Sequence, residues 1–256
     1  MGYFAARSAP LGMVPREVVA AIFYNFAPER VAKALPAAWE IAGPEAALRA
    51  RQESAVAALR RYGITADENV VVAAELAGRA ARGAPLDGRP LFAANLALPW
   101  PEDPLAALWH ATTLLREQRG DAHVAVLAAA GISGRESNVL HAAAGRIPRD
   151  YIARTRDYDE PAWRHYEQQL TERGLLNDDG SLTMAGRQLK DHIEARTDAL
   201  ALSALETLAD DEVETLFQAL TPITRAVVAG GDVPAVTPMD LRREDLDDGS
   251  AHLVNA

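Results

Sequence analysis

The stretch that decides the fold is "IPRDYIARTRDYDEPAWRHYEQQLTERGLLNDDGSLTMAGRQLKDHIEARTDAL", which runs from Ile147 to Leu200. Pro148 begins a first short helix, and Asp159 caps a second helix that has Pro161 in its first turn. The following "GLLNDDGSLT" predicts a β-hairpin, with "LL" and "SLT" as short strands and "DDG" as the turn. Thr183 then caps a long helix. This order predicts a winged helix-turn-helix with a two-stranded β-wing.

The same stretch carries the pattern "LxxRGLLxxDGxLTxxGRxLxxxIExxTD" between Leu170 and Asp198. It resembles the wing and the following helix of MarR-like regulators. The segments "YFAARSAPLG", "VVAAIFYNFAPE", "LPWPEDPLAALWHATTLLREQRGDAHVAVLAAAG" and "LHAAAGRIPR" resemble an actinobacterial family of helix-turn-helix proteins, from Tyr3 to about Leu200. These resemblances imply a helix-turn-helix architecture and a homodimer formed through the long helix after the wing. They imply no specific chemistry.

The N-terminal part predicts a helical bundle. Residues 15–63 suggest three helices with breaks at "FAPER" and "IAGPEAA", where Pro28 and Pro44 stand just inside helix starts and Gly63 supplies a stop. A further helix is expected over 69–82, and a short one in "PLFAANLAL". The expected domains are a helical domain over 1–99, a helical unit with the winged helix over 100–202, a C-terminal helix over 203–230 and a flexible acidic tail over 231–256.

The stretch Leu108–Ile132 predicts two helices around a break. Gly120 is expected to stop the first helix, and Asp121 to cap the second. Gly131 and Gly145 are expected to end this second helix and the next one, because a helix often stops at a glycine in a left-handed conformation.

Composition favours a mainly α fold and restricts the chemistry. Apolar residues make up 49% of the chain and aromatic residues only 6%, so Ala, Leu and Val must build the interior. The absence of cysteine excludes disulfides, thiolate zinc sites and a cysteine nucleophile. Without an apolar run of about 18 residues, the sequence predicts a cytoplasmic protein with no membrane partner. The net charge of -10 disfavours a free-standing DNA-binding protein.

One helix face predicts a ligand site. His110, Thr113 and Glu117 are separated by three and four residues in a helix flanked by two tryptophans. If this face points outward, Arg116 to Arg119 and Asp121 would form ordinary exposed ion pairs. If it points into a groove between the domains, the same groups would line a pocket with aromatic walls. The leading hypothesis is a small-molecule-binding, regulatory protein on a winged-helix scaffold. The expected ligand-binding residues are Tyr24, Asn25, Trp100, Trp109, His110, Thr113 and Arg116.

The first alternative is a cofactor-independent enzyme of specialised metabolism. His110 or His123 would be its acid–base group, oriented by Glu117 or Asp121. No glycine-rich nucleotide motif, phosphate loop or Gly-x-Ser-x-Gly motif occurs, so no cofactor is expected. The spacing of His110, His123 and His141 matches no ligand motif, so no metal site is expected either.

The second alternative is a MarR-like, DNA-binding transcriptional regulator. Its recognition helix would offer Arg164, His165 and Gln168 to the major groove. The wing tip, residues 177–180, has the sequence "NDDG" and carries two carboxylates where a wing normally offers Arg or Lys to phosphate. DNA is therefore a possible partner that the charge of the chain disfavours.

Overall fold

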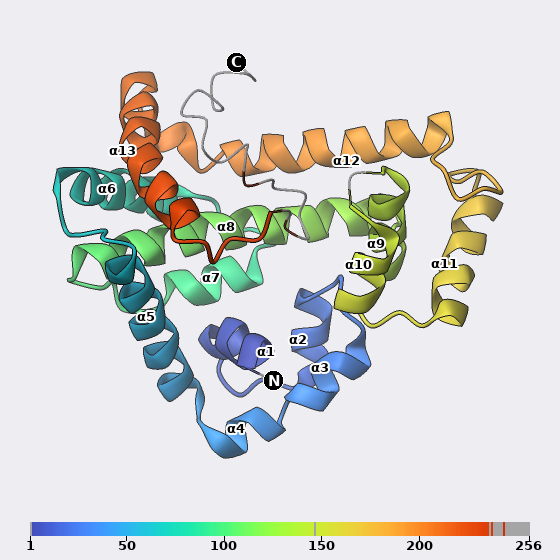
Figure 1. Cartoon of the computed structure of the whole chain (residues 1–256), viewed down its shortest axis with the longest axis horizontal. Helices are drawn as coiled ribbons and strands as arrows, with labels where there is room; N and C mark the ends of the chain where they lie inside the picture. The colour runs from blue at the N-terminus through green and yellow to red at the C-terminus, as the bar shows by residue number, and fades with distance from the viewer. Residues whose placement is uncertain (1, 146, 236, 238–242, 244–256) are drawn as a thin grey trace. The chain divides into compact units, whose positions relative to one another are not determined.

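The computed structural model describes residues 2–145, 147–235, 237 and 243, and every regular element among them is a helix (Figure 1). The α-helices are α1 (Gly2–Ser8), α2 (Arg16–Ile22), α3 (Pro28–Ala34), α4 (Ala37–Ile41), α5 (Pro44–Arg61), α6 (Glu68–Gly83), α7 (Pro90–Leu96), α8 (Pro104–Ala129), α9 (Gly134–Ala143), α10 (Arg149–Thr155), α11 (Glu160–Glu172), α12 (Met184–Leu202) and α13 (Asp210–Ala229). Short 3-10 helices cover Ala9–Leu11 and Leu205–Thr207. The predicted mainly α fold class is confirmed.

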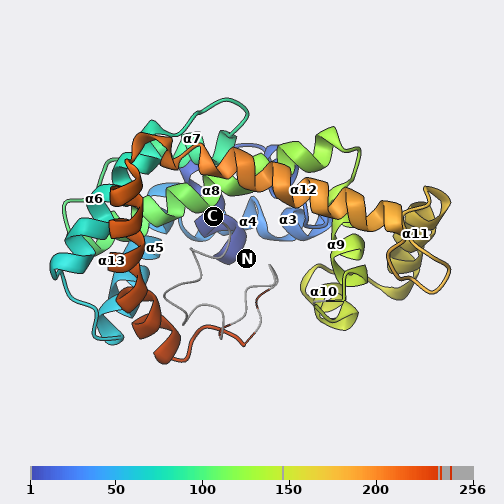
Figure 2. The ribbon, with the colours of Figure 1, turned by 90° about the horizontal axis from the view of Figure 1, so that it is seen from above.

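The chain forms two compact units, each built from two separate stretches of sequence. Unit 1 contains the residues up to Pro44 together with Arg119–Leu200, and unit 2 contains Glu45–Gln118 together with the described residues from Ala201. The long helices α8 and α12 are continuous and contribute residues to both units (Figure 2). The linear domains over 1–99, 100–202 and 203–230 stay predictions. Most of the predicted flexible tail, 231–256, lies outside the described residues.

Local helix signals place most helix starts correctly. Pro28 and Pro44 are the first residues of α3 and α5. The Asp159 side chain accepts a hydrogen bond from the Ala162 N–H at 2.8 Å and so caps α11. Thr183 caps α12 in the same way. These starts depend on side chains within one turn of the helix, which is why the sequence predicts them.

Three of the four predicted glycine stops are confirmed. Gly63, Gly131 and Gly145 have φ angles of +80°, +66° and +76°, and each follows the end of a helix. The predicted stop at Gly120 is wrong, because α8 runs through it as one helix from Pro104 to Ala129. A glycine inside a helix costs only about 1 kcal/mol. The Leu, Arg, Glu, Gln and Ala residues around it are strong helix formers, and the helix is packed on both sides of the glycine.

The predicted two-stranded β-wing is wrong. Leu176 and Leu182 form a single antiparallel bridge, and no strand occurs within the described part of the chain. The segment 173–183, here called the 173–183 turn, closes tightly because the Asn177 N–H donates to the Ser181 carbonyl at 2.9 Å. Since α12 begins at Met184, too few residues remain for a return strand. Both bridge leucines are buried, so they serve the hydrophobic core of unit 1.

Each unit has its own apolar core. In unit 1, Phe4, Phe23 and Phe26 pack edge to face, with ring centroids 5.1–6.4 Å apart. In unit 2, α13 lies along α6, and their small and aliphatic side chains form a core with residues from α5 and α8. Arg79 of α6 and Glu212 of α13 add an ion pair at 2.5 Å.

Candidate functional site

Helices α9, α10 and α11 of unit 1 form a three-helix arrangement in which α9 contacts both of the others. Ile152 of α10 and Trp163 of α11 are buried in its core. At the start of α9, a Cβ on Gly134 would lie 1.8 Å from the Tyr24 carbonyl oxygen, so only glycine fits there. Helices α10 and α11, joined by a short turn, have the order and lengths of a helix-turn-helix.

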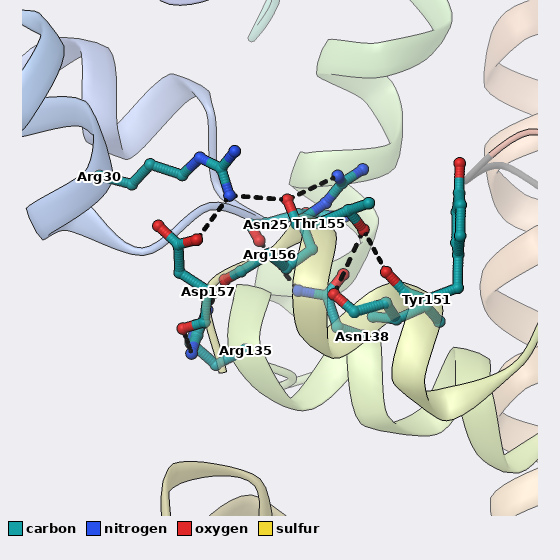
Figure 3. Close-up of polar contacts among 9 residues, drawn as sticks. Asn25, Arg30, Arg135, Asn138, Tyr151, Thr155, Arg156 and Asp157 are labelled. Atoms are coloured by element: carbon teal, nitrogen blue, oxygen red, sulfur yellow. Dashed lines mark hydrogen bonds and ion pairs between the residues drawn. The ribbon is translucent and has the colours of Figure 1, made fainter. Parts of the chain in front are cut away.

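Two arginines from other helices hold the turn between α10 and α11 (Figure 3). Arg30 of α3 donates from Nη1 to the Thr155 carbonyl at 2.9 Å and to Asp157 Oδ1 at 2.8 Å. Arg135 of α9 donates to the carbonyls of Arg156, at 2.5 Å, and of Asp157, at 3.0 Å. Asp157 has a φ of +53°, a conformation that L-residues other than glycine adopt rarely. The arginine bonds therefore support a backbone conformation that is unfavourable by itself.

Tyr158 continues this network into α9. The Arg135 guanidinium lies 3.4 Å from the Tyr158 ring centroid, and the Tyr158 hydroxyl donates to the Arg135 carbonyl at 2.6 Å. Burial raises the pKa of Tyr158 to about 12, so the phenol keeps its proton at neutral pH. Asn138 donates to the Tyr158 hydroxyl and to the Asn25 carbonyl. These bonds connect the helix-turn-helix to the N-terminal helices of unit 1.

The exposed side of α11 carries all three residues predicted to contact DNA. We call it the α11 outer face and define it by Glu160, Arg164, His165, Gln168 and Glu172, all of which are exposed. Arg164 Nε donates to Glu160 Oε1 at 2.9 Å, and Gln168 Nε2 donates to Glu172 Oε1 at 2.8 Å. Arg149 of α10 donates to Glu160 Oε2 at 2.7 Å. Each carboxylate oxygen of Glu160 therefore accepts a hydrogen bond from a different arginine.

An open groove of about 590 Å³ separates α11 from the tip of the 173–183 turn. It is lined by one arginine and four carboxylates, together with uncharged polar groups: Arg164, Glu167, Gln168, Thr171, Glu172, Asn177, Asp178, Asp179 and Gly180. Such a groove repels phosphate. In the sequence of unit 1 as a whole, however, basic and acidic residues nearly balance, so most of the acidic excess of the chain belongs to unit 2.

The predicted ligand-binding residues are divided between the two units. Tyr24 and Asn25 belong to unit 1, where the Tyr24 hydroxyl donates to the Ile132 carbonyl at 2.8 Å and Asn25 accepts from Asn138. The remaining residues belong to unit 2: Trp100, Trp109, His110, Thr113 and Arg116. The Tyr24 hydroxyl and the Asn25 backbone carbonyl therefore make hydrogen bonds around the start of α9, and ligand binding by these two residues stays a prediction.

The helix face predicted from the spacing of His110 and Glu117 is buried in unit 2, with 3% and 2% of these residues exposed. Arg51 of α5 reaches this region, where its Nη2 donates to Asn95 Oδ1 of α7 at 3.0 Å. Glu117 accepts from Arg116 at 2.5 Å. We call this group the His110 cluster and define it as Arg51, Arg82, Asn95, Trp100, Trp109, His110 and Glu117. Sequence reasoning missed Arg51 and Asn95, since Arg51 has the spacing of an ordinary solvent-facing arginine.

His110 is neutral and incompletely hydrogen-bonded. Burial, reinforced by the charges of Arg51 and Arg82, lowers the pKa of His110 to about 4. Its Nε2 is buried and has no hydrogen-bond partner. The Trp100 ring contacts the imidazole edge to face at 4.9 Å, and the Arg82 guanidinium lies 3.7 Å from the Trp100 ring centroid. A buried polar atom left unpaired in this way needs an explanation.

The predicted catalytic residues are also divided. His110 and Glu117 belong to unit 2, whereas Asp121 and His123 belong to unit 1. The Thr197 hydroxyl donates to the Ile193 carbonyl, so its oxygen accepts from His123 Nδ1 at 3.0 Å. Burial lowers the pKa of His123. Among the described residues, no group of three or more His, Asp or Glu side chains is placed to hold a metal ion.

The fold and the α10–α11 geometry define a helix-turn-helix protein. A family model described as a helix-turn-helix family matches residues 1–234, and the chain belongs to this family. No curated protein and no solved structure matches it. No helix in the described part is long and apolar enough to cross a membrane. The MarR-like and actinobacterial aspects of the resemblance stay predictions.

Proposed function

We propose that this protein is a regulatory protein that contacts DNA through the α11 outer face. The observation that carries the proposal is a complete helix-turn-helix with a packed inner side, whose second helix leaves Arg164, His165 and Gln168 exposed. Arginine and glutamine are residues that recognise base edges in the major groove. Membership of a helix-turn-helix family supports the same function.

The charges on this surface predict weak and salt-sensitive binding. Exposed ion pairs such as Arg164–Glu160 contribute about 0–1 kcal/mol, so Arg164 can exchange the carboxylate for a phosphate at little cost. The four carboxylates in the groove oppose any DNA backbone that approaches there. Binding to a preferred sequence therefore needs base contacts from α11.

The experiment is selection from a randomised duplex pool at low salt, followed by fluorescence anisotropy on the enriched sequence. Arg164→Ala is expected to lower the affinity by about tenfold, because a base or phosphate contact is lost. The matched control is Arg60→Ala, which removes an exposed, ion-paired arginine from α5. The proposal fails if the folded protein enriches no sequence, or if both variants lose affinity equally.

The predicted homodimer belongs to the same proposal. A twofold dimer presents two copies of α11 to two half-sites and doubles the number of contacts. Sedimentation velocity over a range of concentrations measures the oligomeric state. A monomer at every concentration, in the presence of the enriched duplex, would contradict the dimer but not single-site binding.

A second candidate function, small-molecule binding, is favoured by the His110 cluster of unit 2. Its specific support is the Nε2 atom of His110, which lacks a partner although the residue is 3% exposed. Binding is favoured over acid–base catalysis, because an imidazole with a pKa of about 4 is a weak general base. A protein with both functions would be a ligand-responsive regulator.

Native mass spectrometry of the purified protein tests this second function. A co-purifying small molecule is expected with the wild type and is expected to be lost in His110→Phe. The matched control is His165→Phe, which makes the same change at an exposed position. If the molecule still co-purifies with His110→Phe, the His110 cluster is not its binding site.

A further inference from the structure

The charges that act on His110 are positive. Arg51 approaches from α5 and Arg82 from α6, and both lower the pKa of the imidazole. Trp100 contacts the imidazole with its ring and carries the Arg82 guanidinium on its face. The charges of two guanidinium groups thus act on a neutral imidazole whose Nε2 is buried and unpaired.

The carboxylate of Glu117 does not accept a hydrogen bond from His110 Nε2. Glu117 accepts from Arg116 and interacts electrostatically with Arg51. The charges of Arg51 and Arg82 are the ones that act on His110. The environment of His110 Nε2 is therefore suited to a negative group supplied from outside the chain.

We propose that the His110 cluster binds a small organic carboxylate. In the tautomer with the proton on Nε2, His110 donates to one carboxylate oxygen, while Arg51 and Arg82 attract the charge. The indole of Trp100, which contacts the imidazole, provides apolar contact for the body of the ligand. This inference rests on the small-molecule binding proposed above and names the class of ligand.

The same charges argue against other ligand classes. Two guanidinium groups repel a cationic amine. A neutral ligand would gain no attraction from the charges of Arg51 and Arg82. A dianionic phosphate would lose more hydration energy than a monoanionic carboxylate on entering a buried site.

The test uses long-range ¹H–¹⁵N NMR of the imidazoles in the full chain, with sodium benzoate as the probe. Benzoate is expected to shift the His110 Nε2 resonance in a saturable way. Neutral benzamide, which has nearly the same shape, and inorganic phosphate are the matched probes and are expected to leave it unchanged. Bound benzoate is also expected to raise the pKa of His110 above its value of about 4, because a nearby anion favours the imidazolium.

Two variants on α6 separate a local contact from the total charge. Arg82→Gln is expected to weaken benzoate binding by about tenfold, since a charge-assisted interaction is lost. Arg79→Gln makes the same change of charge at the other exposed arginine of α6, which pairs with Glu212 and does not contact Trp100, and is expected to change the affinity by less than about twofold. If Arg82→Gln fails to fold, His110→Gln replaces it; its amide nitrogen keeps a donor, and partial binding is expected.

Each contrary outcome has a distinct meaning. An equal response to benzamide would overturn the carboxylate inference and leave small-molecule binding intact. Absence of any shift at probe concentrations on the order of 10 mM would also overturn it. If, in addition, no molecule co-purifies with the protein, the small-molecule function fails as well. An equal loss in the two arginine variants would assign the effect to net charge and contradict the proposed contact.

Discussion

The α11 outer face and the His110 cluster contain the same kinds of side chain in opposite surroundings. On α11, Arg164 and Glu160 form an ion pair with side chains that are 74% and 50% exposed. In the His110 cluster, His110 and Glu117 are 3% and 2% exposed. Water screens the first pair and makes it weak, whereas burial makes His110 and Glu117 depend on their partners.

The difference in exposure indicates which of the two regions suits DNA contact and which suits small-molecule binding. An exposed ion pair exchanges partners easily, which suits a surface that gives up its own carboxylates to contact DNA. The buried polar groups of the His110 cluster, His110, Glu117 and Asn95, are held in fixed positions, which suits selective binding of a small molecule. The unpaired Nε2 of His110 is a loss of stability that packing alone does not explain.

The largest expected effect is on Glu117. Glu117→Gln removes a buried negative charge and leaves Arg51 without its electrostatic partner. We expect the free energy of unfolding to fall by about 3 kcal/mol, because a buried charge is left uncompensated. Urea denaturation at pH 7 measures it. The matched variant Glu160→Gln, on the α11 outer face, is expected to change stability by less than about 0.5 kcal/mol. Equal losses of stability in Glu117→Gln and Glu160→Gln would contradict the proposed difference between the two regions.

The next effect is a pH dependence from His110. Its pKa is about 4 in the folded protein and 6.5 in its ordinary state, so between these values the unfolded chain binds a proton that the folded chain does not. The contribution to stability is complete above pH 6.5 and is lost as the pH falls towards 4, by roughly 3 kcal/mol. Urea denaturation of the wild type and of His110→Phe over this range isolates the contribution as a difference. Identical pH profiles would show that the imidazole is not held neutral by the fold.

A smaller effect, of opposite sign, is expected for His110→Phe at pH 7. The phenyl ring keeps the edge contact with Trp100 and removes the unpaired nitrogen, so the free energy of unfolding is expected to rise by about 1 kcal/mol. His165→Phe on the α11 outer face is expected to stay within about 0.5 kcal/mol of the wild type. Destabilisation by His110→Phe would mean that the imidazole is already well accommodated in the absence of a ligand.

The smallest effect on stability is expected for Glu160→Gln. The same variant is expected to change the affinity for DNA. Glu160→Gln and Glu172→Gln remove the same charge from α11, but only the first frees Arg149 and Arg164. Both are expected to change stability by less than about 0.5 kcal/mol. On the enriched duplex, Glu160→Gln is expected to raise the affinity about fivefold and Glu172→Gln by less, with a steeper salt dependence for the first. Equal gains would show that net charge, rather than the freed arginines, controls binding.

Sequence signals that act within one helical turn predicted most of the fold. Asp159, with Pro161 after it, marks the start of α11, and Gly131 and Gly145 mark helix ends. Gly120 misled the prediction because packing on both sides of α8 outweighs the modest helix penalty of a glycine. The β-wing was wrong because strand pairing depends on how much chain remains before Met184, and on where the leucines find a core.

The candidate site was predicted only in part. The spacing of His110 and Glu117 correctly put both on one side of α8, where both are buried in unit 2. The partners Arg51 and Asn95 come from α5 and α7, and nothing in their local sequence distinguishes them from ordinary polar residues. Arg30 and Arg135, which hold the α10–α11 turn, were missed for the same reason.

The sequence by itself determined the helical class, most helix ends and the helix-turn-helix order, because caps, prolines and glycines act on backbone atoms a few residues away. Only the tertiary structure decided that Arg164 lies in solvent beside Glu160, and that His110 lies buried with an unpaired nitrogen on which the charges of two arginines act. The reason is that burial and charge pairing depend on residues far apart in the chain. Those long-range contacts determine whether the same side chain is a weak surface ion or a specific binding group.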